Sequence, residues 1–381
     1  MKRAAKVFGQ GVKPTIVQIA GYYPPSLGGM ERVAQELSEE LARRAYDVRV
    51  LTSNVNQSRG SEPEKPHLHV RRLWAFEFAH TPFAPGFIPA LFRMPKHSVF
   101  HLHLAQGFYP EWTLLIAKLR RIPYVLHFHL DLEPSGRLGF LFKAYKAIVI
   151  SAVIKHADAV IVFSPEQLTF IHKRYGIPRQ KIVIIPNGVG TEYFAPRRAA
   201  RVKGHTPSLL YVGRISQQKR VHILTEAMGL LHEPARLVVV GDGEDRVAVE
   251  TAVPKSLKSH ITFTGQLPPE QTLAYFRDAD AFVMASRIEG MPLAVLEAMA
   301  SGLPIVGADV PGIRELVRGV GVLVKDPSPQ TFAGSLDNLL ANPALRDELS
   351  KKSSDAARQY SWPSLTDRFE QLYNAVCKGM R

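Results

Sequence analysis

The chain of 381 residues is longer than a typical single domain, so we expect two domains that each bury a core. Its hydrophobic content of 46% and charged content of 22% are typical of a soluble globular protein. The single cysteine, Cys377, excludes an internal disulfide, and no apolar run is long enough to span a membrane. We therefore expect a cytoplasmic protein.

Positive charge is concentrated in the first half of the chain. The net charge is +14, and residues 1–190 carry 25 Lys and Arg against 13 Asp and Glu, whereas residues 191–381 carry 23 against 21. This asymmetry indicates an anionic partner for the first half, and both a nucleic acid and an anionic membrane surface fit it. Residues 1–13 are basic but lack an apolar segment, so we interpret them as a disordered extension rather than a signal peptide.

The first half alternates short apolar strands with amphipathic segments. Apolar residues at helical spacing predict a helix from about Met30 to Leu41 and another around 111–120. The predicted strands of this half are 15–20, 47–53, 98–104, 124–130, 159–164 and 181–188.

The second half repeats the pattern, with predicted strands at 208–214, 236–243, 260–265, 281–286, 304–309 and 321–324. Strands that alternate with helices indicate a parallel, doubly wound sheet. We therefore predict an α/β protein with two Rossmann-like doubly wound parallel-sheet domains, 14–190 and 208–359. The stretch 187–207 is rich in Gly, Pro and basic residues, and we expect the linker there, at 191–207. We also expect a last helix, 360–381, that can pack back on the first domain.

The first candidate site is the loop GRISQQKR (213–220), which lies between a predicted strand and the helix behind it. Backbone N–H groups and the helix dipole favour an anion at such a place. The guanidinium of Arg214 and the ammonium of Lys219 would suit a diphosphate, because one offers a planar fork and the other a point charge. A pair of solvated surface charges is the alternative.

The second candidate site is the stretch SRIEGMPLAVLEAMASGLPIV (286–306). Glu289 precedes a helix that Pro292 can open at its first position, and Glu297 lies on the second turn. This helix is apolar almost all round, so we expect it to be buried, and its carboxylate needs a partner. Ribose hydroxyls or a structural salt bridge would supply one. The N–H groups that can face an anion there belong to Gly290, Met291 and Leu293.

This stretch closely resembles the Glu–seven residues–Glu signature of the retaining glycosyltransferases of family 4. Further motifs follow in the order and spacing of that family, so the resemblance covers nearly the whole chain. It implies a GT-B fold, in which two Rossmann-like domains face a cleft and the second holds most of the donor. The motifs are PPSLGGMERVAQELSEELARRAYDVRVLTS (24–53), VIIPNGV (183–189), LLYVGRISQQKRV (209–221), VVVGDGED (238–245) and FTGQLP (263–268).

The resemblance also implies roles for single residues. It assigns the diphosphate to Arg214 and Lys219, the donor sugar to Glu289 and the ribose to Glu297. The expected catalytic residues are Glu289, His129 (near the sugar and the leaving group), Arg214 and Lys219. The other expected donor-binding residues are Gly28, Gly29, Asn187, Leu267, Gly290, Met291, Leu293 and Glu297. Many family members have Phe-Gly where this chain has Met291-Pro292, and because Pro292 has no N–H, one backbone contact is missing.

Three other patterns have simpler interpretations. Asp278-Ala279-Asp280 has the spacing of a metal-binding pair but falls between a helix and a strand, and we expect no required metal. The pairs His101/His103 and His127/His129 make a four-histidine metal site conceivable, yet core or cleft histidines explain them better. Gly241-Asp242-Gly243 follows a strand like a dinucleotide fingerprint, but Arg246 replaces the third glycine.

The basic, apolar segment 139–154 has two interpretations. It would serve as an interfacial helix at an anionic membrane or as a crossover helix packed on the sheet.

We therefore expect a retaining, metal-independent glycosyltransferase, without a cofactor, that moves a sugar from a nucleotide-sugar donor to an acceptor hydroxyl. The basic first half favours a glycolipid or lipid-linked glycan acceptor and peripheral contact with an anionic membrane at its inner face. The alternatives are a phosphorylase, a nucleotide-sugar epimerase and a non-catalytic sugar-nucleotide binding protein. A nucleic-acid partner would explain the charge but not the two glutamates, so we expect none.

Overall fold

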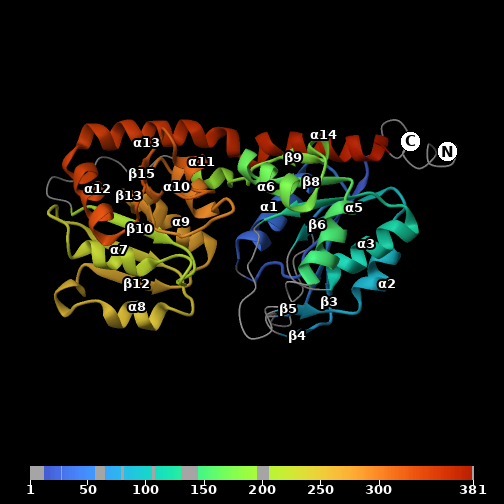
Figure 1. Cartoon of the computed structure of the whole chain (residues 1–381), viewed down its shortest axis with the longest axis horizontal. Coiled ribbons are helices and arrows are strands. Elements are labelled where there is room, and N and C mark those ends of the chain that lie inside the picture. The colour runs from blue at the N-terminus through green and yellow to red at the C-terminus, as the bar shows by residue number, and fades with distance from the viewer. Residues whose placement is uncertain are drawn as a thin grey trace. The chain divides into compact units, whose positions relative to one another are not determined.

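The computed structural model describes residues 13–379 except 27, 56–64, 79–80, 105–107, 130–144 and 195–205. The chain forms two compact units (Figure 1). The first unit runs to Asn187 and takes up the chain again at Trp362, and the second comprises Gly188–Ser361. The predicted basic extension, residues 1–13, lies outside the described residues except for Lys13.

The first unit contains a parallel sheet in the order β3-β2-β1-β6-β7-β8-β9. The order reverses between β1 and β6, which is the topological switch point where doubly wound sheets bind ligands. The strands are β1 (Thr15–Ile19), β2 (Val48–Ser53), β3 (Leu68–Leu73), β6 (Ser98–Leu104), β7 (Tyr124–Phe128), β8 (Ala159–Val162) and β9 (Ile182–Ile184). A separate antiparallel pair joins β4 (Phe76–Phe78) and β5 (Thr81–Phe83).

Helices flank this sheet because their apolar stripes need a surface to cover. In α6, for example, the Ser164 side chain caps the first turn by accepting from the N–H of Gln167, and Gly176 ends the helix with φ of 67°. The helical segments of the unit are α1 (Gly29–Arg43), α2 (Phe87–Phe92), α3 (Tyr109–Arg120), η2 (Lys146–Ile150), α5 (Ser151–His156), α6 (Pro165–Tyr175), η3 (Arg179–Lys181) and α14 (Trp362–Gly379).

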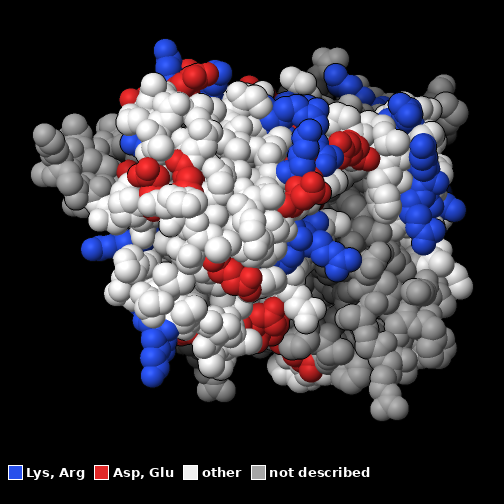
Figure 2. Space-filling view, turned by 60° about the vertical axis from the view of Figure 1, so that its left-hand side comes forward, with Lys and Arg blue, Asp and Glu red and all other residues white. Residues whose placement is uncertain are grey.

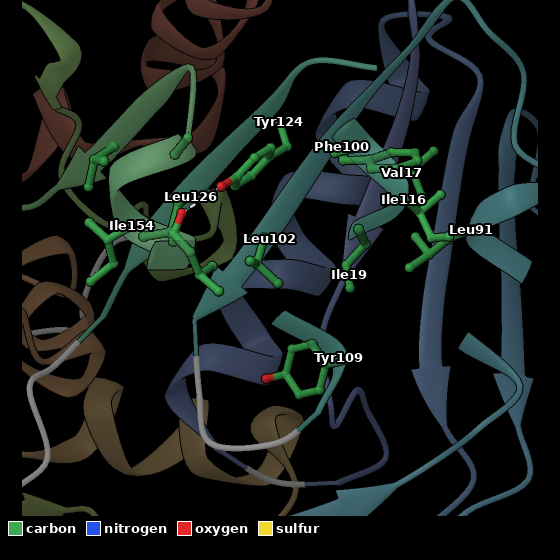
Figure 3. Close-up of a cluster of buried hydrophobic side chains, with 14 of the residues drawn as sticks. Val17, Ile19, Leu91, Phe100, Leu102, Tyr109, Ile116, Tyr124, Leu126 and Ile154 are labelled. Atoms are coloured by element: carbon green, nitrogen blue, oxygen red, sulfur yellow. Dashed lines mark hydrogen bonds between the residues drawn. The ribbon is translucent and has the colours of Figure 1, made fainter. Parts of the chain in front are cut away.

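The core of the first unit lies between the sheet and these helices. Figure 3 shows side chains from β1, β6 and β7 packed with Leu91, Tyr109, Ile116 and Ile154 from the helices. The one polar atom of Tyr124 is satisfied there, since its hydroxyl donates to the carbonyl oxygen of Val153 at 2.5 Å.

The last helix, α14, packs on the first unit, against α1. The side chains of Phe369 and Tyr373 are fully buried on its inner face. The guanidinium of Arg44 on α1 donates to the carbonyl oxygen of Pro363 at 2.6 Å and pairs with Asp367, and the indole of Trp362 donates to Glu36. The chain therefore completes the first unit only with its C-terminal residues.

The second unit contains a parallel sheet in the order β12-β11-β10-β13-β14-β15. Its strands are β10 (Ser208–Val212), β11 (Arg236–Val240), β12 (Ile261–Gly265), β13 (Ala281–Met284), β14 (Ile305–Ala308) and β15 (Val322–Val324). Two parallel α/β units confirm the predicted fold class.

The helical segments of the second unit cover both faces of its sheet, and apolar side chains fill the space between the layers. They are η4 (Thr191–Phe194), α7 (Val221–Met228), α8 (Arg246–Ala252), η5 (Lys255–Leu257), α9 (Pro269–Asp278), α10 (Leu293–Ala300), α11 (Arg314–Val317), α12 (Pro329–Ala341), α13 (Pro343–Ala357) and η6 (Arg358–Tyr360).

The second unit starts earlier than the sequence predicted. The chain leaves the first unit after Asn187, whereas we placed the linker at 191–207. Within that stretch, Thr191–Phe194 is already part of the second unit, because the buried ring of Tyr193 packs against Phe276 with centroids 5.5 Å apart. The linker was predicted further along the chain because Gly and Arg occur in the residues after Phe194.

Candidate active site

The loop between β10 and α7 is held in place by backbone and side-chain hydrogen bonds. The buried hydroxyl of Tyr211 donates to the carbonyl oxygen of Arg214 at 2.8 Å, and the N–H of Ile215 donates to the carbonyl oxygen of Asp242 at 2.9 Å. Arg220, in the left-handed region with φ of 50°, ends the loop as the N-cap residue of α7. The loop is therefore built into the unit rather than free in solvent.

A second loop, from Ser286 to Pro292 between β13 and α10, is fastened to the first. The guanidinium of Arg220 donates to the carbonyl oxygens of Ala285 at 2.8 Å and Ser286 at 3.1 Å. The Gln218 side chain donates to the carbonyl oxygen of Ile288, also at 2.8 Å. The two candidate sites found in the sequence therefore form one region of the second unit.

Lys219 and Glu289 form the central contact of this region. The Lys219 ammonium lies 2.5 Å from a Glu289 carboxylate oxygen, and the two side chains are 19% and 7% exposed. A charge-assisted hydrogen bond with so little solvent access is stronger than an exposed one, and loss of either partner would leave the other charge uncompensated. The structure thus joins the residue expected at the diphosphate with the residue expected at the sugar.

Arg214 has a different partner. Its side chain is 71% exposed and donates to the Glu244 carboxylate at 2.9 Å. Nearby, Arg246 pairs with Asp242, also at 2.9 Å. Figure 2 shows places on one face of the molecule where basic and acidic side chains lie next to one another. Exposed pairs of this kind contribute little to stability, so the Arg214 guanidinium can exchange Glu244 for a phosphate at small cost.

Glycines let the loops approach each other closely. A Cβ atom on Gly241, whose φ is 141°, would lie 1.9 Å from the carbonyl oxygen of Gly213. A Cβ atom on Gly312, whose φ is 86°, would lie 2.6 Å from the carbonyl oxygen of Glu289. Because both obstacles are backbone atoms, larger residues cannot fit without a shift of the loop. Gly312 supports the backbone of the Glu289 loop, and no motif in the sequence marks it.

We predict that Gly312→Ala destabilises the second unit by about 3 kcal/mol or more, because it combines a strained backbone with a clash against Glu289. Gly319→Ala is the matched control: its φ is 83°, but nothing lies within 4 Å of the added methyl group. In that control the free energy of unfolding should fall by only about 1–2 kcal/mol, the ordinary cost of the left-handed region. Urea unfolding measures both, and equal losses would contradict a support role for Gly312.

Helix α10 is buried as predicted, with one difference at its start. Pro292 is the N-cap residue with ψ of 121°, so the helix begins at Leu293 rather than at the proline. Glu297 lies on the second turn and is 4% exposed. The N–H of Val295 already donates to the carbonyl oxygen of Pro292 at 3.2 Å, so the N–H groups of Leu293 and Ala294 are the ones that the geometry of a helix start offers to an anion.

The remaining expected donor residues are spread over both units. Gly290 and Leu293 are half-buried, and Met291 is buried beside them. Leu267 is half-buried in the segment before α9, and Asn187, 4% exposed, is the last residue of the first unit.

Gly28 and Gly29 lie at the start of α1 in the first unit. Both are exposed, and Gly28 is the N-cap residue with φ of −176° and no side-chain cap. This position leaves the first N–H groups of α1 without a competing side-chain oxygen from residue 28. The Glu31 carboxylate lies beside Gly28, where an added Cβ atom would be 2.1 Å from its oxygen, and the contact of a phosphate with this loop stays a prediction.

His129, which follows β7, belongs to a cluster of four histidines. Residues 103 and 127 are register partners on β6 and β7, and His101, His103 and His127 are fully buried. His103 Nδ1 lies 3.0 Å from His129 Nε2, and His101 Nε2 lies 3.2 Å from His127 Nδ1. Burial lowers the pKa of all four rings, those of His101 and His129 to about 3, and neighbouring imidazoles lower the pKa of His101, His103 and His127 further.

The four histidines are joined by hydrogen bonds to one another and to neighbouring side chains. Ligand atoms of His101, His103 and His127 lie within 4.8 Å of one another. The rings of His101 and His103 stack, with 21° between their planes. His101 Nδ1 contacts the Tyr373 hydroxyl at 2.7 Å, and His103 Nε2 contacts the Gln18 side-chain oxygen at 2.8 Å.

The two other patterns in the sequence are structural. Asp280 receives the backbone N–H of Ser208 on its carboxylate at 2.7 Å, which fixes the start of β10 beside β13. Asp242 accepts from the N–H of Gly243 and pairs with Arg246, and the first of these contacts is the larger cause that lowers the pKa of its carboxyl. The glycines that follow β11 therefore serve loop packing.

The basic segment 139–154 is only partly described, because residues 130–144 lie outside the described part. The segment from 145 onward forms η2 and α5, and both pack on α3. Val153 and Ile154 are fully buried, which fits a crossover helix, whereas Ile148 is 72% exposed.

Two family models match consecutive parts of the chain. The model for a glycosyl transferase 4-like domain matches residues 28–188, and the model for glycosyl transferases group 1 matches residues 195–358. The chain belongs to the group 1 glycosyltransferases.

Several known proteins are similar to this one over nearly its whole length. The D-inositol 3-phosphate glycosyltransferase of Corynebacterium diphtheriae is 25% identical over an alignment of 383 positions. The alignment covers 91% of this chain and 89% of that protein. Sucrose-phosphate synthase from Thermosynechococcus elongatus has a TM-score of 0.81 at 22% identity, covering 96% of this chain and 100% of that one. Anabaena HepE, solved with UDP-glucose, has a TM-score of 0.73 at 16% identity, with 95% and 100% covered. The glycosyltransferase therefore has the predicted GT-B fold.

Proposed function

We propose that this glycosyltransferase is a retaining enzyme that moves a sugar from a nucleoside-diphosphate sugar to an acceptor hydroxyl. The observation that carries the proposal is the nearly buried contact of Lys219 with Glu289, at 2.5 Å, beside the start of α10. In this proposal the ammonium stabilises negative charge on a leaving diphosphate, and the carboxylate accepts hydrogen bonds from sugar hydroxyls.

The donor chemistry follows from these groups. Arg214 supplies a second cation that is 71% exposed, and the first N–H groups of α10 supply neutral donors. Fixed cations can neutralise the charge that develops on a diphosphate, so we propose that no metal and no other cofactor is required. Glu297 would hold the ribose from its buried position on α10.

The stereochemical claim has a direct test. Full-length enzyme is incubated with a nucleotide sugar of known anomeric configuration and a panel of acceptors, with a chelator present, and the linkage formed is assigned by NMR. We expect the new glycosidic linkage to have the same anomeric configuration as the sugar in the donor. An inverted linkage, turnover that depends on orthophosphate, or conversion of the donor without any acceptor would contradict the proposal.

We further propose that the acceptor is a glycolipid or lipid-linked glycan at the inner face of an anionic membrane. No helix in the described part of the chain is long and apolar enough to cross a membrane. Neighbouring elements of the first unit nevertheless expose large apolar side chains among basic ones. The exposed apolar residues of α2, α3 and η2 are Ile88, Phe92, Leu115, Leu119 and Ile148.

The basic residues beside this surface support a lipid partner. The guanidinium of Arg120 lies 5.4 Å from the ring centroid of Phe92, and Lys118 and Arg121 flank it on the end of α3. Peripheral membrane proteins typically insert apolar side chains into the lipid interface. Their cations then face the anionic headgroups.

We predict that the enzyme binds vesicles with anionic lipid at low salt and that Leu115→Ser/Leu119→Ser weakens binding roughly 10-fold, since two apolar side chains are lost from the interface. Val247→Ser is the control, because Val247 is 77% exposed on α8 of the other unit. Sedimentation with vesicles measures this. Equal binding to neutral vesicles, or no effect of the double substitution, would remove the membrane proposal.

A further inference from the structure

A chain of hydrogen bonds runs from the sheet core to His129. The side-chain oxygen of Gln18 on β1 lies 2.8 Å from His103 Nε2, and His103 Nδ1 lies 3.0 Å from His129 Nε2. Gln18 and His103 are fully buried, so water does not compete for these contacts. His129 follows β7 and is only partly buried.

The order of donors along this chain follows from elementary chemistry. An amide oxygen only accepts, so His103 Nε2 must carry the hydrogen. A neutral imidazole has one N–H, and the complete burial of His103 favours the neutral form, so its Nδ1 is an acceptor. The hydrogen between the two rings therefore belongs to His129 Nε2. In a neutral His129, the remaining nitrogen, Nδ1, then has a free lone pair.

We propose that Gln18 and His103 are positioning residues that hold His129 in the Nε2–H tautomer, so that its Nδ1 presents a hydrogen-bond acceptor to the substrate. The hydrogen bond that the described residues make with the His129 ring involves Nε2 and leaves Nδ1 for another partner. Stacking supports the orientation of the ring, with the His127 centroid 4.4 Å away and that of His103 5.3 Å away.

The tautomer determines which group His129 can contact. A bare Nδ1 accepts a hydrogen bond from a hydroxyl, whereas it cannot donate one to a leaving phosphate oxygen. The matching substrate group is therefore a sugar hydroxyl, and this part of the inference rests on the proposed function. The tautomer itself does not depend on the identity of the substrate.

The second pair of histidines provides a matched control. His101 contacts the Tyr373 hydroxyl at 2.7 Å and His127 at 3.2 Å, whereas its link to Gln18 is indirect and runs through the Tyr373 hydroxyl. It is as buried as His103 and stacks on it with centroids 4.7 Å apart. A substitution at His101 disturbs the packing of the cluster but leaves the contacts of Gln18 with His103 and of His103 with His129 unbroken.

The test is the state of the His129 ring nitrogens in the ¹⁵N-labelled full-length protein. Long-range ¹H–¹⁵N correlations distinguish a protonated nitrogen from a bare one, and loss of the signals in His129→Asn assigns them. We expect Nε2 protonated and Nδ1 bare in the wild type and in His101→Phe. In Gln18→Met and in His103→Phe the His129 signals should move toward the other tautomer or a mixture. A protonated Nδ1 in the wild type, or the same His129 tautomer in Gln18→Met and His103→Phe as in the wild type, would overturn the proposal.

Turnover is a second measurement, and it distinguishes the positioning role of Gln18 from the proposed sugar transfer. If the proposed transfer holds, Gln18→Met should lower kcat about 10-fold or more and change KM for the donor little, because the wrong tautomer impairs the chemical step. His101→Phe should change kcat less than about threefold. If the wild type transfers no sugar but the tautomer shifts as expected, the proposed function fails and the positioning role stands.

Discussion

Glu289→Ala should lower sugar transfer at least 100-fold while binding of the free nucleoside diphosphate is unchanged or tighter. The carboxylate is expected at the sugar, which the free nucleotide lacks. The structure adds a reason for tighter binding, because the Lys219 ammonium now lies 2.5 Å from Glu289 and would become available to the diphosphate. Steady-state kinetics and calorimetry measure the two quantities separately.

Glu244→Ala is the control for this experiment. Glu244 also pairs with a cation of the same region, Arg214, but it is 54% exposed. Its removal should change transfer less than about threefold, since exposed pairs contribute little. A comparable loss of transfer and of nucleotide binding in Glu289→Ala would show that the carboxylate supports the loop rather than contacts the sugar. Glu289→Gln, which keeps the shape, distinguishes the effect of charge from that of packing.

Acid should destabilise the first unit steeply. Burial holds the pKa of His101 at about 3, and those of His103 and His127 well below the value near 6.5 of an unfolded chain. The unfolded chain therefore binds more protons as the pH falls below about 6.5. Each such group then removes about 1.4 kcal/mol of the free energy of unfolding for every pH unit down to its folded pKa.

Urea unfolding at pH 7.5, 6.0 and 5.0 measures this loss. All three tryptophans, Trp74, Trp112 and Trp362, lie in the first unit, so their fluorescence reports on it alone. His101→Phe/His127→Phe removes two of the groups, so the stability of that variant should depend less on pH between 6.5 and 5. Parallel pH profiles of the wild type and the variant would show that the cluster does not control acid stability.

The alternation of strands and helices could be predicted from the sequence because buried parallel strands are continuous apolar runs. All six strands of the second unit lie where the sequence placed them, although their ends differ by a few residues. Strand β3 (Leu68–Leu73) was missed, because it is an edge strand whose four middle residues, which include His69 and Arg71, are exposed or half-buried. An edge strand needs only one apolar face, so its hydrophobic signal is weak.

The site was predictable as a set of residues but not as a set of contacts. The spacing of Glu289 and Glu297 placed one before α10 and one on its second turn, and the structure agrees. The contact of Lys219 with Glu289 joins residues that are 70 positions apart, and it depends on how Arg220 fastens the two loops. Likewise, the two His-x-His pairs predicted a shared face, whereas the role of Gln18 requires the strand order β1-β6-β7.

The central claim is that the loops around Glu289 and helix α10 form a nucleoside-diphosphate site. The most direct test is thermal unfolding of the wild type and Glu297→Ala with UDP, GDP, ADP and dTDP in turn, in the presence of a chelator. A ligand at 100 times its Kd stabilises the folded state by about 2.7 kcal/mol, so one diphosphate should raise Tm in the wild type and not in the variant. If none of the four nucleotides raises Tm, the site is not a nucleotide site and the account is wrong.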